Sequence, residues 1–151
     1  MEPPRFVPEP FIRPTALCVI RRVEQILVQR MAPRPDGVPA FRPLGGGIEF
    51  GEYAIDAARR EMQEELGANV VNPLFLGTFE NIFRSNGEPA HEIAFIYEAQ
   101  FPDPSWYECE TFAGLEDDGA EIHAAWKPLL AFEQGKALLY PEGPLAVLTQ
   151  P

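Results

Sequence analysis

The chain has 151 residues, of which 46% are hydrophobic and 23% are charged, and this is typical of a single soluble domain with one sizeable core. Its net charge of -11, with no basic block, argues against long nucleic acid as a partner. No apolar run approaches the roughly 18 residues of a membrane span, and the first residues lack the apolar core of a secretion signal. We therefore expect a cytoplasmic protein without a membrane partner.

The first half of the chain begins with a proline-rich segment. Residues 1–14 contain five prolines, too many for a helix or a central strand, so we expect an extended N-terminal arm followed by one domain over residues 15–151. Two strand-like segments, residues 15–20 and 25–30, flank a short polar interruption and predict a hairpin. Residues 31–40 hold three prolines and a glycine and predict a loop.

A glycine run precedes the clearest helix signal. Residues 45–47 are three consecutive glycines, which predict a tight bend or a close approach of the backbone to another group. Residues 53–66 contain neither Pro nor Gly, and Gly67 then supplies a stop signal. The apolar residues of this predicted helix recur at helical spacing, at Ile55, Ala58, Met62 and Leu66.

The second half of the chain predicts mainly strands. Residues 70–83 and 92–101 are rich in β-branched and aromatic residues and flank the turn sequence Ser-Asn-Gly-Glu, so we expect a second hairpin. Residues 102–119 are acidic and predict irregular structure. Residues 121–126 indicate another strand, and residues 128–139 indicate a short helix.

Three glutamates on the predicted helix are candidates for chemistry. Glu61, Glu64 and Glu65 stand at i, i+3 and i+4, so we expect them on one side of the helix, opposite its apolar stripe. Like charges at this spacing repel by about 0.2–0.5 kcal/mol per pair, and a bound Mg²⁺ would turn that repulsion into attraction. The alternative is a solvated acidic face with an ordinary Arg60–Glu64 pair. The nearby glycines favour a metal site that could hold a diphosphate.

These residues also follow a known family pattern. Gly46, five residues, Glu52, seven residues and then Arg-Glu-Met-Gln-Glu-Glu-Leu-Gly-Ala over residues 60–68 resemble the Nudix box, in which a small Ala68 takes the place of a bulky aliphatic residue. The resemblance implies an α/β fold, a Nudix-type α/β/α sandwich around a mixed β-sheet. It also implies a hydrolase acting on a nucleoside diphosphate linked to another moiety X, through water attack at phosphorus.

The resemblance assigns expected roles to the residues of the box. Glu61, Glu64 and Glu65 match metal-binding catalytic glutamates, and Glu61 is the box residue most often proposed as the base. Arg60 matches the arginine that holds the acidic cluster, and Glu52 matches a supporting carboxylate. The carbonyl of Gly45 could complete the metal shell. The expected cofactor is Mg²⁺, which Mn²⁺ could replace, and the expected partner is a small phosphorylated substrate, a nucleotide derivative.

Candidates outside the box are less constrained. Related enzymes often supply another acidic ligand before a Trp-centred segment, and residues 121–129 are similar to that segment, so Glu121 is the candidate metal ligand. Glu116, Asp117 and Asp118 stay open as alternatives. Arg30 and Arg42 are candidate substrate-binding residues, because each could donate a fork of hydrogen bonds to phosphate near the glycine run.

Other functions on the same scaffold are weighed against hydrolysis. A catalytically silent Nudix-like sensor would bind a nucleotide without turnover, but such modules can lose box glutamates and this chain keeps them. An isomerase would need a cysteine near the metal, and neither Cys18 nor Cys109 adjoins the box. The sequence leaves the identity of X, the number of metal ions and the presence of a homodimer open.

Overall fold

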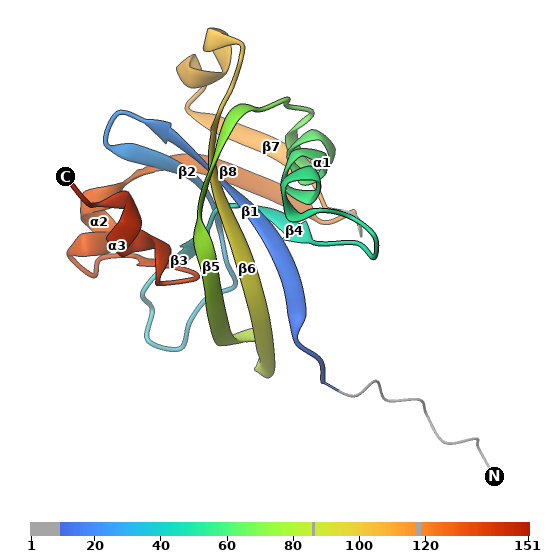
Figure 1. The fold of residues 1–151 in the computed structure, drawn as a ribbon. Coiled ribbons are helices and arrows are strands. Elements are labelled where there is room, and N and C mark those ends of the chain that lie inside the picture. The colour runs from blue at the N-terminus through green and yellow to red at the C-terminus, as the bar shows by residue number, and fades with distance from the viewer. Residues whose placement is uncertain (1–9, 86, 117–118) are drawn as a thin grey trace.

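A computed structural model describes residues 10–85, 87–116 and 119–151 of the chain. In this part of the chain, helices lie on both sides of a large mixed sheet (Figure 1), so the predicted α/β/α arrangement is confirmed. Most of the expected N-terminal arm lies outside the described residues. The first strand begins at Arg13, within the range expected for the arm.

The described residues form nine strands and three α-helices. The strands are β1 (Arg13–Arg22), β2 (Gln25–Arg30), β3 (Ala40–Arg42), β4 (Leu44–Gly47), β5 (Val71–Ser85), β6 (Glu88–Gln100), β7 (Thr111–Leu115), β8 (Glu121–Pro128) and β9 (Leu138–Leu139). The helices are α1 (Ala54–Leu66), α2 (Leu129–Glu133) and α3 (Pro144–Leu148), with a 3-10 turn η1 at Pro104–Glu108.

Strand β1 organises the sheet, because it pairs with three other strands. Its first eight residues run parallel to β6, and residues 15–18 also pair antiparallel with β4. Its last two residues pair antiparallel with β2, which makes the first predicted hairpin. The second predicted hairpin is the long β5–β6 pair. Both hairpin predictions are confirmed.

The glycine run forms a strand, which the sequence did not predict. Strand β4 places Ala16 opposite Gly46 and Leu17 opposite Gly45. The predicted close approach is confirmed, since a Cβ atom on Gly45 would lie 2.1 Å from the carbonyl oxygen of Ala16. Glycine therefore lets β4 lie close to both β1 and α1 with no side chain in the way.

The segment expected to be irregular contains a further strand. Within residues 102–119, β7 pairs antiparallel with β8, so the prediction was wrong at residues 111–115. Small side chains explain the miss, because Ala113 and Gly114 give this short strand little of the β-branched character by which strands are recognised.

Two apolar layers hold the sheet between the helices. Alternate residues of β1 point to opposite sides, so Cys18 and Ile20 pack in the cluster with Met62 of α1. Leu17 and Val19 pack in another cluster with residues of α2 and α3. This period-2 division fixes which face of β1 meets α1.

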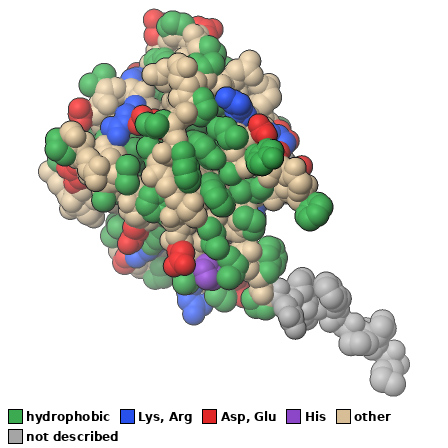
Figure 2. Space-filling model, viewed as in Figure 1, with side chains coloured by type: hydrophobic (Ala, Val, Ile, Leu, Met, Phe, Trp, Pro, Cys, Tyr) green, Lys and Arg blue, Asp and Glu red, His purple; other side chains and the backbone are tan. Residues whose placement is uncertain are grey.

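One broad face of the molecule shows many apolar side chains over β5 and β6 (Figure 2). Phe75 of β5 is 48% exposed, and its ring lies 5.3 Å from that of Tyr97 and 6.4 Å from that of Phe95. Among the described helices, none has the length and apolar character needed to cross a membrane.

Candidate active site

Helix α1 carries the candidate glutamates and ends as the sequence predicts. Gly67 is its C-cap in the left-handed conformation, with φ 68°, and its N–H donates to the carbonyls at the helix end. The predicted placement of the glutamates was wrong for two of them. Glu61 and Glu65 are 6% and 5% exposed and lie on the buried side, beside Met62, while the side chain of Glu64 is 41% exposed.

The buried position of these carboxylates depends on glycines that face the helix. A Cβ atom on Gly46 would lie 2.7 Å from the carboxyl carbon of Glu61, and one on Gly114 would lie 1.7 Å from the main-chain oxygen of Glu65. Strands β4 and β7 therefore approach α1 closely enough to enclose its acidic side. A helical pattern alone could not show this, because it assigns charged residues to solvent.

Arg60 connects the glutamates to the loop before the helix. Its Nε and Nη2 donate to the two carboxylate oxygens of Glu52 at 2.8 and 2.9 Å, and Nη2 also donates to the carbonyl of Gly47 at 3.0 Å. Its Nη1 donates to Glu61 at 3.0 Å and to Glu64 at 3.2 Å. Hydrogen bonding to Arg60 lowers the pKa of Glu52. In turn, the carboxylates of Glu52 and Glu61 raise the pKa of Arg60.

Glu65 is the most strongly perturbed acid of the site. Burial raises the pKa of its carboxyl group to about 8, and the charge of Glu61 acts in the same direction. Its Oε2 atom is buried and, among the described residues, accepts no hydrogen bond. Arg42 partly offsets this effect by favouring the charged form. A buried carboxylate oxygen without a donor is suited to receive a cation.

The buried carboxylates open into a small cavity of about 250 Å³. Its lining contains Glu61, Glu65 and Glu116 together with two glycines and two arginines, namely Gly45, Gly46, Arg13 and Arg42. In the described part of the chain, no three Asp, Glu, His or Cys side chains lie close enough together to hold a metal ion. The donors still fit a hard divalent cation, because they are carboxylate and carbonyl oxygens and one of them is buried without a partner.

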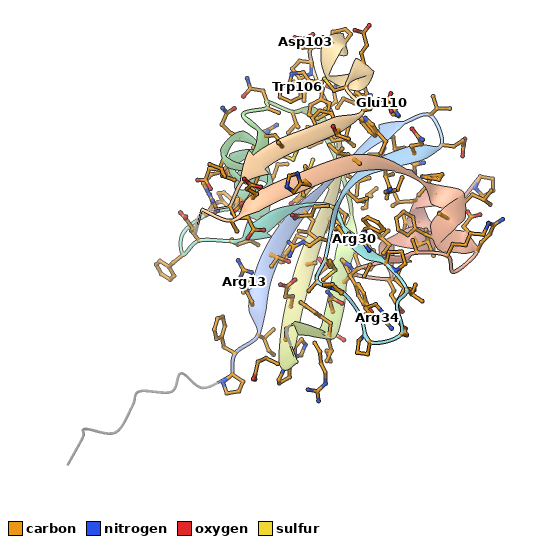
Figure 3. The ribbon with its side chains drawn as sticks, turned by 180° about the vertical axis from the view of Figure 1, so that it is seen from behind. Arg13, Arg30, Arg34, Asp103, Trp106 and Glu110 are labelled. Carbon is orange, nitrogen blue, oxygen red and sulfur yellow. The ribbon has the colours of Figure 1, made fainter. Side chains whose placement is uncertain are left out.

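A larger cleft of about 920 Å³ adjoins this cavity, and Arg13, Arg42 and Glu116 line both. Arg30 also lines the cleft, so the two predicted substrate-binding arginines face one space. Figure 3 shows Arg13 and Arg30 on β1 and β2. The side chain of Arg42 donates to the carbonyl of Gly45 at 3.4 Å, and its buried Nε has no acceptor among the described residues.

The structure separates the candidates for the additional acidic ligand. Glu121 is exposed, lies 3.3 Å from His123 and is not among the residues that line the cavity. Glu116, one of the alternatives, does line it, whereas Asp117 and Asp118 lie outside the described residues. Glu64 lies at the edge of the site in its pair with Arg60.

Two further residues of the cleft, Arg13 and Glu92, were not among the candidates from the sequence. They face each other because β1 runs parallel to β6 in a register that pairs Arg13 with Glu92. Seventy-eight residues separate them along the chain, and no local sequence signal links them. Only the strand register brings them together.

Comparison with known proteins agrees with this geometry. A family model described as the NUDIX domain matches residues 11–142. A MutT NUDIX hydrolase from Burkholderia pseudomallei is 26% identical, with a TM-score of 0.55 over 79% of this chain and 84% of the other. A NUDIX hydrolase from Nitrosomonas europaea is 21% identical, with a TM-score of 0.61 over 91% and 86%. A MutT protein from Bacillus halodurans is 19% identical, with a TM-score of 0.57 over 92% and 81%.

Proposed function

Since the chain belongs to the NUDIX family and is a Nudix hydrolase, we propose that it hydrolyses the diphosphate linkage of a nucleoside diphosphate joined to another moiety. Water would attack at phosphorus. The observation that carries this proposal is the junction of two spaces, a cavity lined by buried Glu61 and Glu65 and a cleft lined by arginines. Carboxylates to hold a cation and arginines to hold phosphate are what this reaction needs side by side.

The proposed cofactor is Mg²⁺, with Mn²⁺ able to replace it. The residues that would hold it are Glu61, Glu64 and Glu65 of α1, with the carbonyl of Gly45. We assign the additional acidic ligand to Glu116 in place of Glu121, because Glu116 lines the same cavity as Glu61 and Glu65. Glu64 would have to turn from its present pair with Arg60 to reach that cavity.

The chemistry divides between the cation and the side chains. A bound Mg²⁺ supplies charge neutralisation on the diphosphate and makes a water molecule more acidic. We assign to Glu61 the acceptance of that water's proton. A 3.0 Å hydrogen bond from Arg60 orients its carboxylate. Arg30 and Arg42 would bind the phosphates on the cleft side, where their charge offsets the negative charge that develops on the leaving group.

A substrate panel tests the proposal. Nucleotide sugars, dinucleoside polyphosphates, oxidised nucleoside triphosphates and ADP-ribose should be assayed with Mg²⁺ for release of phosphate or nucleotide. We expect hydrolysis of at least one class, and a loss of about 100-fold or more in kcat for Glu61→Gln. Glu64→Gln should also lower kcat. Glu133→Gln removes an exposed carboxylate of α2 with the same change of charge, and it should leave the rate unchanged.

The result also separates hydrolysis from the alternative function. Wild-type rates in the Glu61→Gln and Glu64→Gln variants would refute the catalytic assignment. Binding of a nucleotide without turnover across the whole panel would support a catalytically silent sensor instead. Comparing Glu116→Gln with Glu121→Gln decides the additional ligand. Only Glu116→Gln should raise the Mg²⁺ concentration at which the rate is half-maximal.

A further inference from the structure

Arginines differ in how fully the structure uses their donors. Among the described arginines, only three donate no hydrogen bond from the guanidinium group; these are Arg13, Arg30 and Arg59. Arg59 is exposed on α1 and lines neither the cavity nor the cleft. Arg13 and Arg30 both line the cleft. Unused guanidinium donors inside a cleft favour an anionic ligand, because no protein group there already satisfies them.

Arg13 is held in place without being hydrogen bonded. Its Nη1 lies 3.8 Å from Oε1 of Glu92, whose side chain is only 9% exposed, and this distance is too long for a hydrogen bond. On its other side, the guanidinium covers Gly47, where a Cβ atom would lie 2.9 Å from Nη2 and 3.2 Å from Nε. A buried carboxylate and a bare stretch of backbone therefore orient the group.

The position of Arg13 is also distinctive. Arg13 lines both the cavity that contains Glu61 and Glu65 and the larger cleft, whereas Arg30 lines only the cleft. Figure 3 shows Arg13 near the beginning of β1. A ligand that extends from the cleft to the carboxylates would pass this guanidinium.

We propose that Arg13 binds the phosphate chain of the substrate where the cleft meets the carboxylate cavity, and that Glu92 holds Arg13 in position until the substrate arrives. This assignment rests on the proposed hydrolysis of a diphosphate and adds to it a binding residue outside the Nudix box. The forked guanidinium can donate two hydrogen bonds to phosphate oxygens, which a carboxylate 3.8 Å away does not take up.

Binding of a diphosphate that cannot be hydrolysed tests the contact directly. Methylenediphosphonate with Mg²⁺ should be titrated into the ¹⁵N-labelled full chain while the Nε–Hε signals of the arginine side chains are followed by NMR. We expect the Arg13 signal, identified by its loss in Arg13→Lys, to shift with saturation. We expect the Arg59 signal to stay in place.

Variants of Arg13 and Glu92 test the same contact through the affinity for methylenediphosphonate and the kinetics of hydrolysis. Arg13→Gln should weaken methylenediphosphonate binding by about tenfold and raise KM similarly, with a smaller effect on kcat. Arg13→Lys keeps the charge but not the fork, so its loss should be intermediate. Glu92→Gln removes the charge that holds Arg13 in position, so it should weaken binding by less than Arg13→Gln does. Arg59→Gln is the matched control and should leave both measurements unchanged.

The outcomes separate this inference from the proposed function. An unshifted Arg13 signal, or equal affinity in the wild type and Arg13→Gln, would overturn the role of Arg13 even if the wild type hydrolyses its substrate. A shifted signal together with the tenfold loss would support that role even if no substrate is turned over. If Arg13→Gln does not fold, the wild-type titration and Arg13→Lys still decide the question.

Discussion

At the scale of a single residue, the surroundings of Glu65 change the pKa of its carboxyl group. Burial and the charge of Glu61 raise the pKa of its carboxyl group to about 8, well above the value near 4 of an unfolded glutamate. The folded chain therefore binds this proton more tightly than the unfolded chain does. Without divalent cations, the contribution of Glu65 to the free energy of unfolding should be fully present below about pH 4 and should be lost as pH rises towards 8.

A variant isolates that contribution. Glu65→Gln cannot titrate, so its free energy of unfolding should lose this decline between about pH 5 and pH 9, a difference on the order of a few kcal/mol. The measurement is urea unfolding at several pH values in EDTA, with exposed Glu133→Gln as the control. A decline equal in the wild type and Glu65→Gln would contradict the burial of an unpartnered carboxylate at this position.

The sequence predicted some residues of the site better than others. The spacing of Glu61, Glu64 and Glu65 and the resemblance to the Nudix box made them candidates, because both patterns are local to one helix and its preceding loop. The same spacing could not show that two of them are buried, since burial depends on how β4 pairs with β1 and on β7, which comes from a distant part of the chain. Arg13 and Glu92 escaped prediction for a related reason, because only the parallel register of β1 and β6 joins them.

At the scale of elements, close packing of β7 against α1 sets the shape of the site. A Cβ atom on Gly114 would lie 1.7 Å from the main-chain oxygen of Glu65. Gly114→Ala should therefore push β7 away from the end of α1 and destabilise the fold by about 1–3 kcal/mol. It should also weaken Mn²⁺ binding, because Glu116 follows β7 directly.

A second glycine variant controls for the change in backbone freedom. A Cβ atom on Gly37 would meet no described atom within 4 Å, although its φ of +77° is unfavourable for alanine. Gly37→Ala should cost about 1–2 kcal/mol from this conformation alone and should leave Mn²⁺ binding unchanged. Thermal or urea unfolding and Mn²⁺ titration of both variants measure the contrast. Unchanged Mn²⁺ affinity in Gly114→Ala would remove β7 from the account of the site.

Elements with a strong local pattern were predicted, and elements formed by small residues were missed. Helix α1 and the two hairpins have clear periodicity and turn or stop residues, and the structure confirms them. Strands β4 and β7 contain glycines where strands usually carry β-branched residues. Pairing with neighbouring strands stabilises β4 and β7 despite the low β-propensity of their own residues.

At the scale of the whole molecule, the charge of -11 contrasts with the arginines that line the cleft. An acidic chain repels anionic ligands in general, so local arginines and a cation would have to attract the substrate. A divalent cation bound only by the native state should also raise the unfolding temperature, by an amount equivalent to about 2.7 kcal/mol at 100 times its dissociation constant. Thermal unfolding with Mg²⁺ and with EDTA measures this, and equal midpoints would contradict a native-state cation site.

The possibility of a homodimer stays a prediction at this scale. Apolar side chains gather over β5 and β6 on the face shown in Figure 2. Leu74 and Phe75 of β5 are exposed. The residues that line the carboxylate cavity come from segments other than β5 and β6.

The central claim is that the cavity lined by Glu61 and Glu65 binds the divalent cation. The most direct measurement is the anomalous scattering of Mn²⁺ in crystals of the full chain soaked with that ion. We expect a peak within ligand distance of both carboxylates, with Glu116 rather than Glu121 as the additional acidic ligand. A protein that is active with Mn²⁺ but binds the ion elsewhere, with Glu65 still unliganded, would contradict it.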